Sequence, residues 1–377
     1  MKKVVIAIDS FKGCLSSAEA GKAAAEGIRS VFPECEILSL PIADGGEGML
    51  DVLIAATNGR EVQISAHNPL MEWHDTYYGI SEDGKTAFIE MASISGLPLV
   101  PPEKRNPMLT TSYGTGELIR DALERGCRNF IIGIGGSATN DAGLGMLQAL
   151  GFRFLDKEGK ILETGNGKIL MEVVSIDTSF VHPDLRTSHF TVACDVQNPF
   201  YGLEGAAYIF APQKGADRKM VEALDAGMKN YAEVTAKVIG KDNQNAAGAG
   251  AAGGLGFAFL NYLDGELTPG IQLILDAVHI EDEMKDADVV VTGEGRLDHQ
   301  TAMGKAPVGV AKLGKKYGAK TIAFAGSVTK EAVACNEAGI DAFFPIVRGI
   351  STLEEAMDPD TAKANMAAAA EQVFRLL

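Results

Sequence analysis

The chain of 377 residues has few of the features that mark secreted, zinc-binding or nucleic-acid-binding proteins. Its five cysteines are widely separated, odd in number and never in CxxC spacing, which argues against a disulfide framework and a zinc site. Lys and Arg total 34 against 50 Asp and Glu, and the formal charge of −16 disfavours nucleic acid or an anionic membrane as a partner. No segment resembles a DNA-reading helix with basic residues.

Long hydrophobic runs are also missing. The first apolar run stops at Asp9, which is too early for the core of a secretory signal. The longest uncharged stretch, residues 243–263, is mostly Ala and Gly and holds too little Leu, Ile or Val for a bilayer span. We therefore expect a cytoplasmic protein whose hydrophobic fraction of 46% is ample for the cores of two domains. Whether the chain forms a homo-oligomer is left open.

Strand-loop-helix units occur near both ends of the chain, which is typical of α/β proteins with a parallel sheet. Strands are predicted over 3–8, 36–40, 288–292, 320–325 and 342–347, and Ser16 and Glu19 have the spacing of a helix capping box. The middle region differs, because it begins with three strands joined as in an antiparallel sheet. We predict a discontinuous domain of residues 1–66 plus 286–377, with a second α/β domain, 67–285, inserted.

Two loops near the N-terminus follow predicted strands and precede predicted helices. ADGGEG carries Asp44, Gly45 and Gly46 among more carboxylates and glycines than a plain connection needs, so a ligand is expected there. The other loop, DSFKG, contributes Ser10 and Lys12. Because parallel sheets bind ligands at the carboxyl ends of their strands, Lys12 and Asp44 are expected to be neighbours.

A third glycine-rich loop, GIGGSATNDAG at 133–143, follows a strand and opens a helix, so its backbone N–H groups suit phosphate oxygens. A tight capped turn explains the glycines but not the four polar candidates together, which are Ser137, Thr139, Asn140 and Asp141. The loop also fits the weak dinucleotide pattern GxGxxA, which keeps an NAD-dependent hydroxy-acid oxidoreductase as an alternative, with Asp156 or Glu158 on the ribose. A non-catalytic, sugar-acid-binding regulator is the other alternative.

Three further loops carry charged or polar candidates. CDVQNPF places Asp195 and Asn198 directly after a strand, and FAPQKGA holds Lys214, although a single lysine is usually solvated. TGEGRLDHQTAMGKAP crowds both signs of charge into Glu294, Arg296, Asp298 and Lys305. Basic groups suit phosphate or carboxylate and acidic groups suit a metal ion that bridges phosphates, as phosphoryl transfer requires. The Walker pattern GxxxxGK[ST] does not occur. SYGTGE is interpreted as a helix cap, and AAGGLGF as a ligand loop, a close packing contact or a hinge.

Taken in order, SFKG, ADGGEG, YGTGE, GIGGSATNDAG, CDVQNPF with GAAYIFAPQKGA, AAGGLGF, and GEGRLDHQT with GKAP closely resemble the motifs of type I glycerate kinases, over about residues 3–350. The resemblance implies ATP-dependent phosphorylation of D-glycerate with Mg²⁺, usually to 2-phospho-D-glycerate. It also implies two α/β domains, a Rossmann-like parallel-sheet domain made of both chain ends and an inserted mixed-sheet domain, with the active site in the cleft between them.

Residue roles within that framework are hypotheses from chemistry. The glycerate carboxylate and the transferring phosphoryl group would be neutralised by Lys12, Arg296 and Lys305. The candidates for the base or the group that orients the hydroxyl are Asp44 and Asp195. Mg²⁺ would be held by Glu294 and Asp298, and nucleotide phosphate by Ser137, Thr139 and Asn140.

Overall fold

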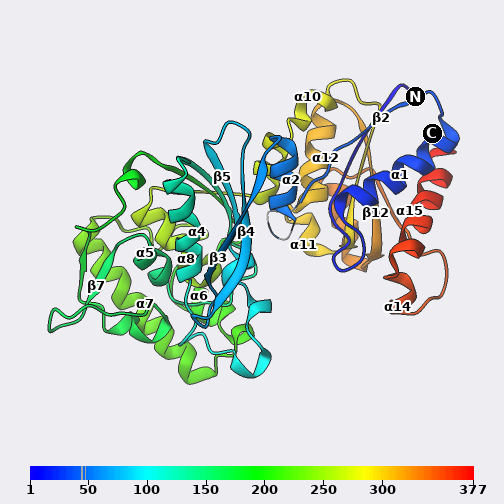
Figure 1. The fold of residues 1–377 in the computed structure, drawn as a ribbon. Helices are drawn as coiled ribbons and strands as arrows, with labels where there is room; N and C mark the ends of the chain where they lie inside the picture. The colour runs from blue at the N-terminus through cyan, green and yellow to red at the C-terminus, as the bar shows by residue number, and fades with distance from the viewer. Residues whose placement is uncertain (44–45, 47) are drawn as a thin grey trace. The chain divides into compact units, whose positions relative to one another are not determined.

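The computed structural model describes residues 1–43, 46 and 48–377, and the chain divides into two compact units (Figure 1). The first unit comprises Met1–Asp44 and Ile271–Leu377, and the second comprises Gly45–Gly270. These limits differ from the predicted 1–66 plus 286–377 and 67–285. The predicted fold class is confirmed, since one unit holds a parallel sheet made of both chain ends and the other a mixed sheet.

The first unit is built on a five-stranded parallel sheet with strand order β13-β12-β11-β1-β2. Its strands are β1 (Lys3–Ile8), β2 (Glu36–Ser39), β11 (Val289–Leu297), β12 (Lys320–Val328) and β13 (Ala342–Pro345). The order reverses between β1 and β11, which pair in parallel with Val5 beside Val290. Such a switch point leaves a crevice at the carboxyl ends of the two strands, where open parallel sheets bind ligands.

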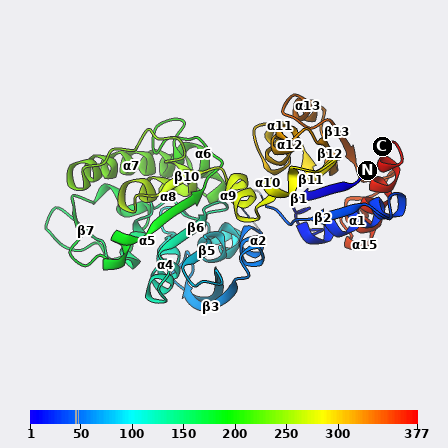
Figure 2. The ribbon, with the colours of Figure 1, turned by 90° about the horizontal axis from the view of Figure 1, so that it is seen from above.

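Helices cover both faces of this sheet (Figure 2). The helices are α1 (Ser17–Val31), α9 (Gly270–Ala277), α10 (Ile280–Met284), α11 (His299–Ala302), α12 (Ala306–Lys316), α13 (Ala334–Glu337), α14 (Leu353–Ala356) and α15 (Pro359–Phe374). Alternate residues of β12 belong to the hydrophobic cores on the two faces of the sheet, because successive side chains of a strand point to opposite faces. Ile322 and Phe324 pack with α1 and α15, whereas Ala323 and Ala325 pack with α12.

Two local predictions are confirmed and two strands are longer than predicted. Ser16 begins α1 with the expected capping box, accepting from the Glu19 N–H at 3.3 Å, and β1 has the expected limits. Strands β11 and β12 continue through GEGRL and GSV because they keep pairing beyond the end of β1, with Arg296 beside Ser327. The first part of the charged segment TGEGRLDHQTAMGKAP, residues 292–307, is therefore strand and not loop.

The second unit is built on a six-stranded mixed sheet with order β10-β9-β6-β5-β4-β3. Its strands are β3 (Arg60–His67), β4 (Trp73–Ile80), β5 (Thr86–Glu90), β6 (Asn129–Gly133), β9 (His189–Ala193) and β10 (Glu266–Thr268). Strand β4 is antiparallel to both neighbours, and the others run in one direction. The carboxyl ends of β3, β5, β6, β9 and β10 therefore share one edge of the sheet.

The helices of the second unit are α2 (Met49–Ala56), α3 (Ala92–Ser95), α4 (Tyr113–Glu124), α5 (Leu144–Ala149), α6 (Ala206–Phe210), α7 (Arg218–Ile239) and α8 (Ala251–Tyr262), and a small hairpin joins β7 (Arg153–Leu155) to β8 (Ser175–Asp177). Neighbouring residues of β4 face different helices. The Tyr78 hydroxyl donates to Asp121 of α4 at 2.6 Å, and Gly79 leaves room for Ile54 of α2. This packing explains why α2 and β3, predicted in the first domain, group with the second unit. None of the helices in the described parts of the chain has the length and apolar character needed to cross a membrane.

Candidate active site

The first unit contains a cavity of about 760 Å³ at the carboxyl ends of β1 and β11. Its lining includes residues from both ends of the chain. Six of the predicted site residues are among them, namely Ser10, Lys12, Glu294, Arg296, Asp298 and Lys305. The fold therefore brings together the DSFKG loop and the charged segment 292–307 at the end of β11, although the whole inserted unit separates them in the sequence.

The loop after β1 is a tight, hydrogen-bonded turn. The Asp9 N–H donates to the Gly293 carbonyl at 2.9 Å, which ties the start of the loop to β11. Phe11 and Leu15 then form a bridge, with the Phe11 N–H donating to Leu15 at 2.8 Å. Lys12 is exposed at the turn of this bridge. Such a short closed loop gives the lysine a defined place beside the cavity.

The acidic residues of the charged segment 292–307 have distinct local partners. Asp298 is the N-cap of α11 and accepts from the Gln300 N–H at 2.8 Å, while its other oxygen lies 3.8 Å from the Arg296 Nε. Glu294 is 7% exposed and accepts a hydrogen bond from the Thr301 hydroxyl. The end of β11 thus presents an arginine to the cavity, while both carboxylates hold the start of α11.

The donor chemistry of this cavity fits Mg²⁺. Asp9, Glu294 and Asp298 all line it, and carboxylate oxygens are the protein ligands that Mg²⁺ prefers. Among the described residues, no group of three or more acidic, His or Cys side chains is arranged to hold an ion by itself. An ion here would therefore need oxygens from water and from a bound phosphate as well, which is the usual arrangement in phosphoryl-transfer sites.

In the second unit, Lys214 is buried against the GIGGSATNDAG loop. Its Nζ donates to the Ser137 hydroxyl at 2.6 Å and to the Thr139 carbonyl at 2.5 Å, and the residue is 2% exposed. Burial lowers the pKa of Lys214 to about 7, although the nearby Asp141 opposes the shift. The lysine of FAPQKGA is thus a fixed part of the loop structure and not the solvated side chain that is usual for lysine.

Asp141 organises the other end of the same loop. Its carboxylate accepts from the Ser112 N–H at 2.8 Å, the Ser112 hydroxyl at 2.7 Å and the Gly145 N–H at 3.2 Å. Burial raises the pKa of the Asp141 carboxyl, and these hydrogen bonds counteract the shift. Ser112 makes no side-chain cap of α4, so the interpretation of SYGTGE as a plain cap is wrong.

The polar side chains predicted to bind phosphate are buried. Ser137 is 7% exposed, and Thr139 and Asn140 are fully buried. Within the described part of the chain, the Thr139 Oγ1 and the Asn140 Oδ1 have no hydrogen-bond partner. The exposed part of the loop is Gly135 and Gly136, so solvent meets backbone there. A phosphate contact by the three side chains remains a prediction.

A second glycine loop packs beneath the first. Residues 252–254, at the start of α8, are left-handed, and a Cβ on Gly253 would lie 2.0 Å from the Thr139 carbonyl oxygen. The Gly253 carbonyl accepts from the Ala142 N–H at 3.0 Å, and the Asn198 carbonyl accepts from the Gly250 N–H at 3.0 Å. Close packing therefore explains the glycines of AAGGLGF, and it links Asn198 to the same cluster.

Two more predicted residues lie at this edge of the second unit. Asp195, which follows β9, is exposed and accepts from the Gly270 N–H at 3.0 Å. Gly46 lies next to the GIGGSATNDAG loop, because a Cβ on Gly135 would be 3.8 Å from the Gly46 Cα. Asp44 and Gly45 lie outside the described residues, and so does the predicted proximity of Lys12 and Asp44.

Sequence reasoning missed three acidic residues. Asp9 directly follows β1, is 1% exposed and lines the cavity of the first unit. Glu90 ends β5 and accepts from the Leu50 N–H of α2 at 2.8 Å. Both directly follow the apolar part of a strand, which is the criterion that selected Asp195 and would have found them too.

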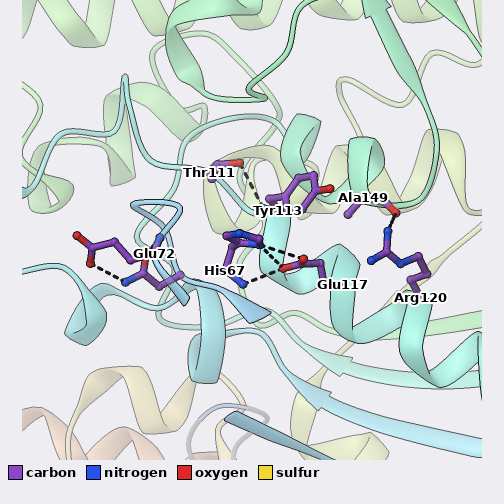
Figure 3. Close-up of polar contacts among 8 residues, drawn as sticks. His67, Glu72, Thr111, Tyr113, Glu117, Arg120 and Ala149 are labelled. Carbon is purple, nitrogen blue, oxygen red and sulfur yellow. Dashed lines mark hydrogen bonds and ion pairs between the residues drawn. The ribbon is translucent and has the colours of Figure 1, made fainter. Parts of the chain in front are cut away.

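The third missed acid is Glu117 of SYGTGE, which pairs with His67 at the end of β3 (Figure 3). The His67 Nδ1 lies 3.0 Å from the Glu117 Oε1, and the His67 N–H donates to the same carboxylate at 2.8 Å. The ring of Trp73 lies on the imidazole, with 4.0 Å between ring centroids. The motif thus joins α4 to the edge of the sheet that carries the other loops.

Comparisons with known proteins all indicate the same family, and each covers at least 94% of the chain. The family described as the glycerate kinase family matches residues 4–377. A glycerate kinase of Haemophilus influenzae is 48% identical over 100% of this chain and 98% of the relative, and a glycerate 2-kinase of Escherichia coli K12 is 49% identical over 94% and 93%. A crystal structure of a protein named as glycerate kinase 2 of Salmonella typhimurium LT2 matches with a TM-score of 0.90 and 45% identity, over 100% of this chain and 98% of that one.

Proposed function

The chain belongs to the glycerate kinase family and is a phosphotransferase that acts on an alcohol group, and from this premise we propose that it transfers the γ-phosphoryl group of ATP to D-glycerate. The product we propose is 2-phospho-D-glycerate, which the name of the E. coli relative supports. The observation that carries the proposal is the meeting of Lys12, Arg296 and Lys305 with buried carboxylates in one cavity.

The charge of the chain explains why these three cations matter. A protein with a formal charge of −16 repels ATP and glycerate at long range, so it has to concentrate positive groups where the anions react. In our proposal Lys12, Arg296 and Lys305 bind the phosphoryl group in transfer and the carboxylate of the acceptor. Fixed positive groups at a developing negative charge are the main source of catalysis in phosphoryl transfer.

Glu294 and Asp298 are our candidates for holding Mg²⁺, in company with phosphate oxygens. The ion, when bound, would neutralise phosphate charge. Asp9 is a third carboxylate of the same cavity and could share that role. The hydrogen bonds from Thr301 and Gln300 keep Glu294 and Asp298 in place for it.

The proposed phosphoryl transfer requires one group that accepts the proton of the glycerate hydroxyl. The 2-hydroxyl oxygen of glycerate bonds to the γ-phosphorus while the bond from that phosphorus to the bridging oxygen breaks, which releases ADP. The hydroxyl proton passes to a carboxylate, for which our candidates are Asp44 and Asp195. Because the transition state is loose, the base contributes less than positioning and charge.

We propose that the GIGGSATNDAG loop binds a second anionic group of the reactants. Its exposed glycines, Gly135 and Gly136, permit a close approach to the backbone, and Lys214 and Asp141 hold the loop from beneath. The nicotinamide alternative is less favoured, because Asp156 is used in a surface turn and accepts from the Glu158 N–H at 2.8 Å.

The test is a coupled assay with ATP, Mg²⁺ and D-glycerate in which enolase, without a mutase, must consume the product. Turnover by enolase is expected and identifies the 2-phosphate. Glycerate binding with no ATP consumption would refute the kinase proposal and support the regulator. The five free thiols fit reducing conditions, so we expect this activity in the cytoplasm.

The base is tested separately with Asp44→Asn and Asp195→Asn. We expect at least one of the two variants to lose turnover, by a factor that stays modest beside the loss of a cation. Near wild-type turnover in both variants would show that neither residue is the base.

A further inference from the structure

The cavity of the first unit has a second set of lining residues that the proposed reaction does not use. Beside the charged and polar groups, the lining has an apolar part that comes mainly from the segment after β13. The apolar residues include Phe11, Ile346, Val347, Leu353, Ala356 and Met357. Nothing in the chemistry of glycerate, a small hydroxy acid, calls for such a surface.

Part of this apolar surface is exposed and yet held in place. Leu353 is 76% exposed and Met357 is 37% exposed. Leu353 begins α14 and Met357 is its C-cap, and the helix starts with a capping box in which the Thr352 hydroxyl accepts from the Glu355 N–H at 3.2 Å. A Cβ on Gly13 would lie 3.2 Å from the Met357 Cε, so the segment contacts the loop that carries Lys12. The apolar surface is therefore ordered before a ligand arrives.

The cavity is also larger than glycerate requires. Pockets of about 300–1,000 Å³ hold ligands of drug size, and this one measures about 760 Å³. A three-carbon acid would fill a small part of it. A second cavity of about 580 Å³, lined by Phe152, Arg186 and Tyr262 among others, contains none of the predicted site residues.

We propose that this cavity seats the nucleoside of the phosphate donor, with its base on Leu353 and Met357 and its phosphates toward Lys12, Arg296 and Lys305. The assignment rests on the proposed function, since it takes a nucleoside triphosphate to be the donor. A flat base has apolar faces that pack well on aliphatic and thioether groups, and its anionic end needs the cations of the same cavity. The segment 346–357 thereby gains a role in binding.

Calorimetric titration of the protein with ATP and with inorganic tripolyphosphate distinguishes the binding of the nucleoside from the binding of the phosphates. Leu353→Ala removes apolar contact area with the base, so we expect the Kd for ATP to rise about tenfold while the Kd for tripolyphosphate stays within twofold. Val333→Ala is the matched control, because Val333 is 62% exposed but lies outside the cavity lining. An ATP Kd within twofold of wild type in Leu353→Ala would overturn the proposal.

A second measurement needs no substitution. Saturating ATP should slow the oxidation of Met357 by hydrogen peroxide at least threefold, as followed by peptide mass spectrometry, whereas D-glycerate alone should not. Met171, 55% exposed in the second unit, is the internal control. Unchanged Met357 oxidation in an enzyme that still phosphorylates glycerate would overturn the nucleoside site and leave the kinase proposal standing. If ATP protects Met357 but the enzyme does not phosphorylate glycerate, the kinase proposal is overturned and the nucleoside site stands. Absence of ATP binding would overturn both proposals.

Discussion

Replacing the buried lysine of the second unit, Lys214→Met, tests how the GIGGSATNDAG loop is held. The substitution keeps an unbranched side chain one atom shorter than lysine but removes the two hydrogen bonds to Ser137 and Thr139. Leaving those oxygens without their donor costs about 1–3 kcal/mol each. The substitution also removes the cost of burying an ammonium group, and that cost depends on pH.

The sign of the pH dependence follows from the pKa of Lys214, which burial lowers from 10.5 to about 7. Between these values the unfolded chain holds the proton and the folded chain does not, so the wild type gains stability as pH rises. A full proton contributes about 1.36 kcal/mol per pH unit. Allowing for partial protonation of the folded state near pH 7, the wild type should gain roughly 1–2 kcal/mol over Lys214→Met between pH 7 and 8.5. Well below pH 7 both states are protonated and the difference levels off.

The assay is urea unfolding followed by tryptophan fluorescence. Trp73 is the single tryptophan and lies in the same unit as Lys214, so its signal reports the unfolding of that unit. Lys219→Met, an exposed lysine of α7, is the control and should show no such pH-dependent difference. A stability difference between wild type and Lys214→Met that stays flat or shrinks from pH 7 to 8.5 would refute the reasoning.

Three other predictions concern the cavity and the loops. Arg296→Met should lower kcat/KM for the glycerate kinase reaction by about 10²-fold, because it removes a positive charge that stabilises the reacting phosphoryl group. Arg29→Met, on the exposed side of α1, should leave kcat/KM unchanged, and equal effects of the two substitutions would contradict the role of the cavity. Gly253→Ala should destabilise the second unit by at least about 2 kcal/mol more than Gly240→Ala, as measured by urea unfolding. Both glycines have a positive φ, but only a Cβ on Gly253 would meet a carbonyl oxygen at 2.0 Å. Cys14 is the cysteine that is not buried, so it should react first with a thiol reagent in the native protein, and faster labelling of any other cysteine would show that the packing is looser than described.

Much of the candidate site could be predicted from the chain because its residues follow strands. Lys12, Glu294 and Arg296 were found as polar groups at the ends of predicted strands, and the cavity of the first unit contains all three. The same criterion applied to Asp9 and Glu90 would have identified them as well. Lys214 shows the opposite case, since neither its position in a loop nor its charge indicates that the fold buries it.

The sequence by itself determined the fold class and the local elements, because a β-branched run such as residues 3–8 and a capping pair such as Ser16 and Glu19 act over a few residues. It also contained the ordered motifs that mark the glycerate kinase family. Only the tertiary structure decided which loops meet, because contacts between residues such as Lys214 and Ser137 depend on the packing of segments far apart in the chain. Burial and the shift in pKa that follows from it arise from that packing, so no local pattern of residues reports them.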